Sequence, residues 1–283
     1  MKVRSTHVLP GPAWDELGRV EVAPTDTPGP DVDVLIVINE PVDLGVYPSL
    51  RLIANYSVGY DRIDVDAAKA RGVAVTNTPG VLDAATADLA MALMLAARRG
   101  LVTGDRLVRA GEWHQEVAGR EVSGATLGIV GFGRIGSAVA RRAASFDMDI
   151  LPVRRSEGDL DAVLRAADIV TLHVPLTAAT TGLITRERLA LLKDGATLVN
   201  TARGGIVDEQ ALVAELVSGR ISAGLDVFAH EPRVPEELWS LDNVVLTPHI
   251  GSATVETRAG MTRIVVDNVL AFMRGDPLAN PVT

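Results

Sequence analysis

The chain contains 283 residues, of which 47% are hydrophobic and 22% are charged, so it is long enough for one large domain or two ordinary ones. Its formal net charge of -9 argues against nonspecific binding of nucleic acid, which needs a basic surface. Cysteine is absent, which excludes disulfide bonds, thiolate catalysis and cysteine-based metal sites, and we predict no metal site. We expect a cytoplasmic protein without membrane contact, because no signal-like run opens the sequence and no apolar stretch reaches the ~20 residues that span a bilayer.

Short apolar segments alternate with helical patterns along the chain. The predicted strands cover residues 3–9, 32–38, 50–55, 73–77, 126–132, 149–153, 168–174, 196–201, 224–228 and 243–248. The predicted helices cover residues 87–99, 136–146, 160–167, 186–192, 209–219 and 262–275. Several strands are nearly continuous in apolar residues, which is typical of parallel strands covered on both faces. This alternation predicts an α/β fold with doubly wound parallel sheets.

Two segments are candidate hinges between domains. The first is NTPG (77–80), before a long apolar helix, and the second lies near HIGSAT (249–254). Cutting the chain there predicts a discontinuous domain made of residues 1–80 and 253–283. Residues 81–252 would form a continuous domain inserted into it.

The segment LGIVGFGRIGSAVARR places Gly131, Gly133 and Gly136 in the spacing G-x-G-x-x-G, between a predicted strand and a predicted helix. Gly131 allows a tight turn, Gly133 lets the backbone approach a pyrophosphate, and Gly136 lets helix and strand pack closely. The helix N-terminus then offers N–H groups to the phosphates. The motif predicts a dinucleotide-binding site; the alternative is an ordinary glycine-rich turn.

The end of the next strand determines which dinucleotide fits. An acidic residue roughly 20 positions after the glycines would bind the ribose 2′-hydroxyl of NAD. Here the strand ends in Arg154, Arg155 and Ser156, whereas Asp149 lies at its start. Guanidinium groups bind phosphate bidentately, so the pattern favours the 2′-phosphate of NADP(H), with NAD(H) possible. The alternative is a pair of solvated surface arginines.

Four further side chains follow predicted strands. Arg203, Asp226, Glu231 and His249 would meet at the carboxyl ends of parallel strands, where ligands bind in open α/β sheets. A histidine can exchange a proton near neutral pH, a carboxylate can orient it, and an arginine can bind a carboxylate or polarise a carbonyl. Taken singly, each residue can also be an ordinary loop side chain.

These motifs together resemble the D-isomer-specific 2-hydroxyacid dehydrogenase family. The resemblance runs from about Arg51 through NYSVGYDRID, NTPGVLDAATADLAMALML, the glycine motif, HVPLTAATTGLI, NTARGGIVDE, GLDVFAHEP and TPHIGSATVETR. It is strongest to the glyoxylate/hydroxypyruvate (hydroxyphenylpyruvate) reductase branch. It implies a Rossmann cofactor domain inserted in a flavodoxin-like substrate domain, and a homodimer with residues 87–125 at the interface.

The resemblance also implies roles for individual residues. Arg203 would bind the substrate carboxylate and carbonyl, Glu231 would keep His249 protonated, and His249 would protonate the carbonyl oxygen. Backbone N–H groups of Val58 and Gly59 would hold the substrate carboxylate, and Asp226 would contact the nicotinamide amide. The complete set of expected cofactor contacts is Gly131, Phe132, Gly133, Arg134, Ile135, Gly136, Arg154, Arg155, Ser156, Val174, Pro175, Thr177, Thr201, Ala202, Asp226 and Gly251.

The sequence departs from the family pattern in two places. A helix near the N-terminus is shortened to about PAWDEL (12–17), and a strand usual in the family is missing after Ser156. The second departure would leave the strand 149–153 at a sheet edge, where Pro152 is tolerated because it donates no ladder hydrogen bond.

The predicted function is NADPH-dependent reduction of a small 2-oxoacid, such as glyoxylate or hydroxypyruvate, to the D-2-hydroxyacid. One alternative is an NAD-linked dehydrogenase that oxidises a D-2-hydroxyacid. Another is a non-catalytic regulator that senses a dinucleotide, although Arg203, Glu231 and His249 argue against it.

Overall fold

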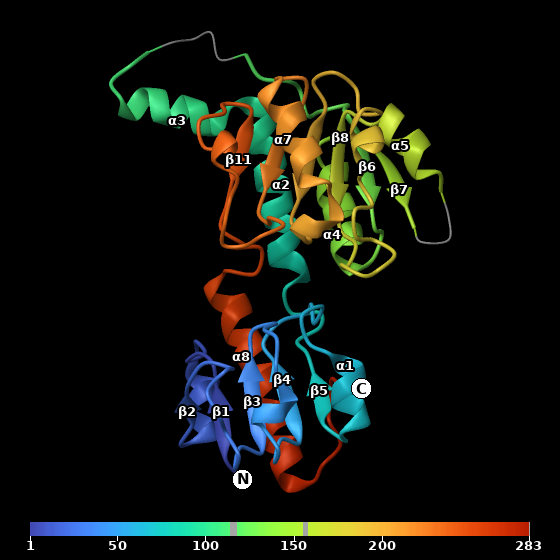
Figure 1. Ribbon diagram of the computed structural model, residues 1–283. Coiled ribbons are helices and arrows are strands. Elements are labelled where there is room, and N and C mark those ends of the chain that lie inside the picture. The colour runs from blue at the N-terminus through green and yellow to red at the C-terminus, as the bar shows by residue number, and fades with distance from the viewer. Residues whose placement is uncertain (114–117, 155–157, 283) are drawn as a thin grey trace. The chain divides into compact units, whose positions relative to one another are not determined.

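The computed structural model describes residues 1–113, 118–154 and 158–282, which belong to two compact units (Figure 1). Unit 1 comprises Met1–Leu82 and Ser252–Thr283, and unit 2 comprises Asp83–Gly251. The sequence predicted borders at residues 80 and 252; the assignment of one unit to the substrate and the other to the cofactor stays a prediction. No helix among the described residues is long and apolar enough to cross a membrane.

Unit 1 is built on a sheet of parallel strands. In sheet order these are β2 (Glu21–Val22), β1 (Val3–Ser5), β3 (Val34–Val37), β4 (Leu52–Asn55) and β5 (Ala74–Thr76). All residues of β3 and β4 are buried, and both strands are apolar apart from Asn55, which fits central strands of a parallel sheet. The order 2-1-3-4-5 is that of flavodoxin-like sheets, so the predicted fold class of this unit is confirmed.

The helices of unit 1 differ in length. They are η1 (Pro12–Leu17), η2 (Leu44–Val46), α1 (Val65–Ala70) and α8 (Val255–Arg274). The short 3-10 helix η1 lies where the sequence indicated a shortened helix. Helix α8 begins earlier than predicted, because the Thr254 side chain caps it by accepting a hydrogen bond from the N–H of Thr257.

Unit 2 contains the second parallel sheet. In sheet order its strands are β11 (Val244–Leu246), β10 (Ser222–Leu225), β9 (Thr197–Asn200), β8 (Ile169–Leu172), β6 (Thr126–Val130) and β7 (Asp149–Val153). Strand β7 pairs with β6 and lies at the edge, as predicted from the missing strand. Pro152 therefore occupies an edge strand, where its lack of an N–H costs no central ladder bond.

Helices cover both faces of this sheet (Figure 1). They are α2 (Asp83–Arg99), α3 (Leu101–Arg109), α4 (Arg134–Ala144), α5 (Leu160–Ala166), α6 (Arg186–Leu189), η3 (Gly204–Ile206), α7 (Glu209–Val217) and η4 (Glu236–Leu238). Helix α3 was not predicted separately. It has no buried residue, so its sequence alone gave little sign of packing against this chain.

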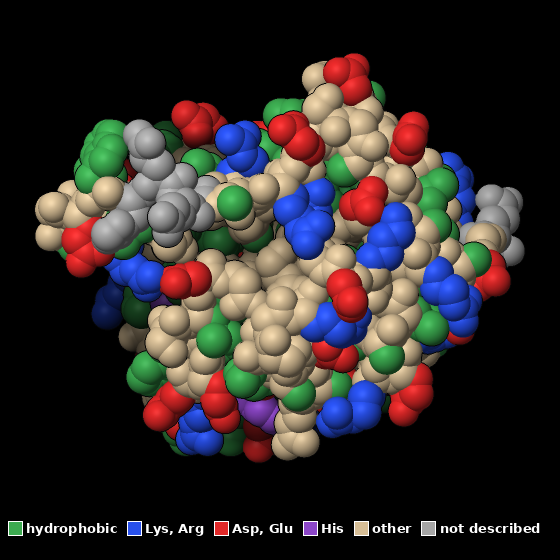
Figure 2. Space-filling model, turned by 90° about the horizontal axis from the view of Figure 1, so that it is seen from above, with side chains coloured by type: hydrophobic (Ala, Val, Ile, Leu, Met, Phe, Trp, Pro, Cys, Tyr) green, Lys and Arg blue, Asp and Glu red, His purple; other side chains and the backbone are tan. Residues whose placement is uncertain are grey.

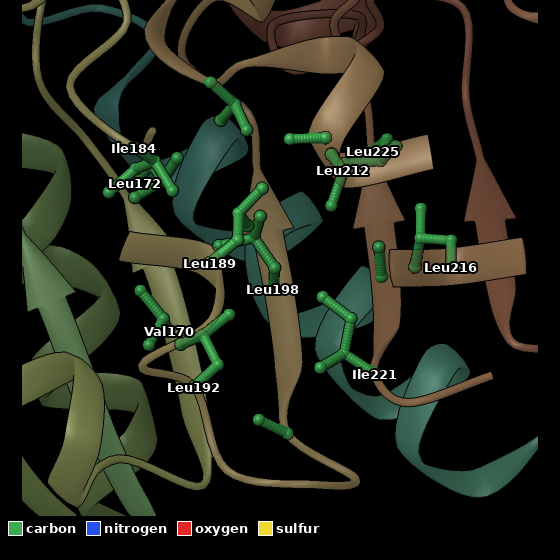
Figure 3. Packing of buried hydrophobic residues seen from close by; sticks show 14 of the residues in the cluster. Val170, Leu172, Ile184, Leu189, Leu192, Leu198, Leu212, Leu216, Ile221 and Leu225 are labelled. Atoms are coloured by element: carbon green, nitrogen blue, oxygen red, sulfur yellow. The ribbon is translucent and has the colours of Figure 1, made fainter. Parts of the chain in front are cut away.

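One part of the core of unit 2 lies between the central strands and the helices α6 and α7 (Figure 3). Leu172, Leu198 and Leu225 come from the three neighbouring strands β8, β9 and β10, and Leu189 and Leu216 come from the two helices. All five are at most 3% exposed. Burial of such side chains contributes about 1.5–3 kcal/mol each, which holds the strand ends in fixed positions.

Charged side chains of both signs are intermixed on the face shown in Figure 2. Basic groups on this face alternate with acidic ones and do not form one continuous basic surface. Together with the net charge of -9, this distribution gives no electrostatic support for binding a polyanion there.

Candidate active site

The side chains that the sequence singled out in unit 2 follow neighbouring strands. Arg203 follows β9, Asp226 and Glu231 follow β10, and His249 follows β11. These three strands are adjacent in the sheet and parallel, so all four residues lie at or after the carboxyl ends of the strands, on the same side of the sheet. Open α/β sheets bind ligands at the carboxyl ends of their strands.

Asp226 organises the loop that carries His249. The side chain is fully buried, and its Oδ1 accepts hydrogen bonds from Thr247 Oγ1 at 2.6 Å and from the N–H of Ile250 at 2.8 Å. Its Oδ2 accepts from the N–H of Gly251 at 2.8 Å. Burial raises the pKa of Asp226 above its ordinary value, although these donors oppose the shift. The carboxyl group therefore fixes the loop after β11 from within.

His249 itself has an unusual backbone. Its φ is 53°, a left-handed conformation that few non-glycine residues adopt, and its N–H donates to Asp226 O at 2.8 Å and Thr247 O at 3.1 Å. Such conformations persist where the surroundings hold them, and they are frequent at active sites. The turn directs the imidazole toward Glu231: His249 Nδ1 lies 2.8 Å from Glu231 Oε2.

The Glu231 carboxylate is ionised in this arrangement. Burial opposes its ionisation. The hydrogen bonds from His249 and from the N–H of Phe228, together with the positive charges of His249 and Arg203, favour the ionised form. These contributions outweigh burial and hold the pKa of Glu231 below its ordinary value. Arg203 thus acts electrostatically on the same carboxylate. The structure brings together the three residues that the sequence predicted as catalytic.

A second histidine at a strand end can be set aside as a proton donor. His173 follows β8, and burial lowers its pKa to about 4, so it is neutral at physiological pH. Its ring contacts Thr171 Oγ1 at 2.9 Å. His249 is half-exposed and lies beside a carboxylate, so it is the better candidate for the proton donor.

Arg203 lies in a turn that Asn200 holds. The Asn200 side chain accepts from the N–H of Ala202 at 3.0 Å and donates to Arg203 O at 3.0 Å. Gly204 follows, and a Cβ there would overlap the carbonyl carbon of Phe228, so only glycine fits. The loops after β9 and β10 can therefore approach closely, which keeps Arg203 near Glu231.

The glycine motif has the geometry expected of a dinucleotide site. Gly131 has φ 95°, and a Cβ at Gly136 would overlap Gly131 O, so both positions require glycine. Gly133 is the N-cap of α4, and a Cβ there would meet nothing within 4 Å. The backbone at Gly133 is thus open to an approaching phosphate, at the positive end of an eleven-residue helix.

Arg154 packs against Phe132 of the glycine motif. Its guanidinium carbon is 5.0 Å from the centre of the Phe132 ring, a cation–π contact that orients an otherwise exposed side chain. Arg155 and Ser156, the other residues predicted to bind a 2′-phosphate, lie outside the described residues.

Of the other predicted cofactor residues, Val174, Pro175, Thr177, Thr201 and Ala202 lie in the loops after β8 and β9. Thr177 and Pro175 form a turn closed by Thr180, whose hydroxyl donates to Pro175 O at 2.5 Å. Thr201 is 8% exposed, and its hydroxyl has no hydrogen-bond partner among the described residues. An unpaired buried hydroxyl costs free energy, so a bound polar ligand is a fitting partner. The glycine turn, the open backbone at Gly133 and this hydroxyl all fit a dinucleotide.

In unit 1, Val58 and Gly59 lie in the loop after β4. Neither was predicted from side-chain chemistry, and the structure shows side-chain amides bound to the carbonyl groups of this loop. Those amides belong to Asn55 and Asn77, which the sequence analysis did not select. Asn200 and Thr247 were likewise not predicted; the available signal was a polar residue at or directly after an apolar strand.

Comparison with known proteins gives a consistent result. The model of the family "D-isomer specific 2-hydroxyacid dehydrogenase, NAD binding domain" matches residues 91–251. Glyoxylate reductase from Pyrococcus furiosus is 51% identical over 271 residues, which cover 87% of this chain and 81% of that protein. The crystal structure of the TT0316 protein from Thermus thermophilus is similar over the full length of both chains, with 42% identity and a TM-score of 0.94. An NADPH-dependent glyoxylate/hydroxypyruvate reductase from Sinorhizobium meliloti, solved with NADP and malonate, has 36% identity and a TM-score of 0.88 over 100% of this chain and 97% of that one.

The role of Asp226 can be tested by an isosteric change. In Asp226→Asn, an amide N–H would face a backbone donor of the loop, so we expect the free energy of unfolding to fall by about 1–3 kcal/mol. Thr247→Val removes only one of the three donors and should cost less, about 1 kcal/mol. Denaturant unfolding measures both, and an Asp226→Asn protein as stable as Thr247→Val would contradict this role.

Proposed function

Since the chain belongs to the D-isomer specific 2-hydroxyacid dehydrogenase family, in its glyoxylate reductase branch, we propose that it reduces a small 2-oxoacid to the D-2-hydroxyacid with NADPH. It is an NAD(P)-dependent oxidoreductase of 2-oxoacids. Glyoxylate and hydroxypyruvate are the substrates proposed here. The observation that carries the proposal is the 2.8 Å contact between His249 and Glu231 beside Arg203.

The residues that would hold the cofactor are those of the glycine turn and of the loops after β7, β8 and β9. When bound, NADPH supplies the hydride that is added to the substrate carbonyl carbon. Backbone N–H groups at the start of α4 would bind the pyrophosphate, and the Thr201 hydroxyl would gain a partner.

His249 would donate the proton that the carbonyl oxygen needs. Its Nδ1 faces Glu231, and the negative charge of this carboxylate stabilises the imidazolium. The Nε2–H is then the proton available to the substrate oxygen as the hydride arrives. Glu231 keeps the ring oriented, and its lowered pKa keeps it ionised while it does so.

Arg203 would bind the substrate carboxylate and polarise the carbonyl. A guanidinium group presents several N–H donors in one plane, which suits two neighbouring oxygens. Backbone N–H groups of Val58 and Gly59 are the carboxylate donors proposed for unit 1. Glyoxylate, hydroxypyruvate and larger 2-oxoacids share the carboxylate and carbonyl that these groups recognise.

The preference for NADPH rests on Arg154. The described residues at the end of β7 contain an arginine stacked on Phe132, at the position where an NAD site would carry a carboxylate. Because β7 is an edge strand, no further strand of the described part of the chain covers this side of the sheet, and the adenosine end would rely on few protein groups.

We also propose a homodimer. Helix α3 buries none of its residues, and the apolar side chains of Leu101, Val102, Val108 and Trp113 are between 52% and 76% exposed. Several exposed apolar side chains in one segment are typical of a protein–protein interface. Light scattering should give twice the mass of one chain, and a monomeric mass would contradict the proposal.

The proton-donor role predicts a large effect of His249→Gln. General acid catalysis contributes about 10²–10⁴-fold, so kcat for glyoxylate should fall by at least about 100-fold, while the dissociation constant of NADPH stays unchanged. The matched control is His230→Gln, an exposed histidine in the loop after β10, which should keep wild-type kcat. Stopped-flow and steady-state oxidation of NADPH measure these values, and a His249→Gln enzyme with substantial kcat would refute the role.

The cofactor assignment predicts a selective effect of Arg154→Asp. Loss of a charge-assisted contact to the 2′-phosphate should raise KM for NADPH about tenfold or more, with a much smaller change for NADH. Arg165→Asp, an exposed arginine of α5, makes the same change in net charge and should leave the NADPH/NADH ratio unaltered. Equal effects of Arg154→Asp on both cofactors would argue for an NAD-linked enzyme.

A further inference from the structure

The loop after β4 is held by its carbonyl groups. Ser57 O accepts hydrogen bonds from the N–H of Thr78 at 3.0 Å and from Asn55 Nδ2 at 3.3 Å. Val58 O accepts from Asn77 Nδ2 at 2.9 Å, and Gly59 O accepts from Asn55 Nδ2 at 2.8 Å. Three successive peptide groups therefore turn their oxygens toward donors of the protein.

The direction of these carbonyl groups determines that of the N–H groups. All three peptide bonds are trans, and in a trans peptide the C=O and N–H point in opposite directions. The N–H groups of Val58, Gly59 and Tyr60 consequently face away from the donors that bind the oxygens. Among the described residues, none of these three N–H groups has a hydrogen-bond acceptor.

Asn55 can act only in one orientation. It is fully buried, and its Oδ1 accepts from the N–H of Asn39 at 2.8 Å, so its Nδ2 must face the loop. The N–H of Asn39 is a fixed donor, which excludes a flipped amide. Asn77 donates to the one carbonyl of the three that Asn55 does not reach.

We propose that Asn55 and Asn77 are positioning residues that aim the N–H groups of Val58, Gly59 and Tyr60 at the carboxylate of the substrate. This inference rests on the proposed function for the identity of the ligand, and it adds Tyr60 N–H as a third donor. The two asparagines touch no substrate. They set the orientation of the peptide groups that do, and their amide side chains are needed because only a donor can hold a carbonyl oxygen.

The test replaces Asn77 in the full-length protein. Asn77→Leu keeps a similar volume without a donor, and Asn77→Asp places an acceptor opposite Val58 O. Both should raise KM for glyoxylate, and Kd for the unreactive carboxylate oxamate in the NADP-saturated protein, by about tenfold, which corresponds to about 1.4 kcal/mol. Both should leave kcat within about threefold and the NADPH dissociation constant unchanged, because the substitutions alter only the proposed contact with the carboxylate.

The matched control is Asn243→Leu in unit 2. Asn243 Nδ2 also donates to two backbone carbonyl groups, those of Leu216 and Ile221, so its loss measures the general cost of removing such an amide. It should change neither KM nor Kd. If Asn77→Leu behaves like Asn243→Leu, or if only Asn77→Asp weakens binding, the positioning role is overturned.

The oxamate titration separates this inference from the proposed function. A wild-type protein that fails to reduce glyoxylate would refute the proposed activity, while the ratio of oxamate Kd values would still decide the role of Asn77. A wild-type protein that reduces glyoxylate, with equal oxamate Kd for wild type and Asn77→Leu, would refute the positioning role alone. A wild-type protein that binds no oxamate would also refute it.

Discussion

The buried carboxyl group of Asp226 is the interaction on which the candidate active site depends. It is fully enclosed, and its oxygens accept hydrogen bonds from Thr247, Ile250 and Gly251 in the segment that follows β11. Burial of this group without these donors would be costly, so the carboxyl group and the loop stabilise each other only in the observed arrangement. The left-handed backbone of His249 lies within this segment, and it sets the imidazole 2.8 Å from Glu231.

The same construction recurs at two other strand ends. Asn200 is the last residue of β9 and binds two backbone groups of the turn that carries Arg203. Asn55 is the last residue of β4 and binds the loop of Val58 and Gly59. In each case a buried polar side chain satisfies backbone groups of a loop that has no ladder partners of its own. Residues at the ends of the rigid parallel strands thus fix the conformation of the loops that follow them.

Much of this arrangement could be predicted from the sequence, because it depends on local patterns. The fold class followed from the apolar strands and the glycine spacing. The polar residues after β9, β10 and β11 indicated that ligands bind at the carboxyl ends of these strands. The position of β7 as the outermost strand followed from the short segment after it. The contacts of Asp226, Asn200, Asn55 and Asn77 could not be predicted. They join residues through loop conformations, such as the left-handed turn at His249, that no periodicity encodes. Helix α3 was missed because none of its residues packs in a core.

The central claim is that Glu231 and His249 work as one proton-donating unit, and a double-mutant cycle tests it most directly. If Glu231 acts only through the imidazole, its removal can do nothing once His249 is gone. The measurement is kcat/KM for glyoxylate in wild type, Glu231→Gln, His249→Gln and the double variant. The predicted result is that the double variant is no slower than His249→Gln alone. If the two single losses multiply in the double variant, Glu231 and His249 act independently, and the account of the site is wrong.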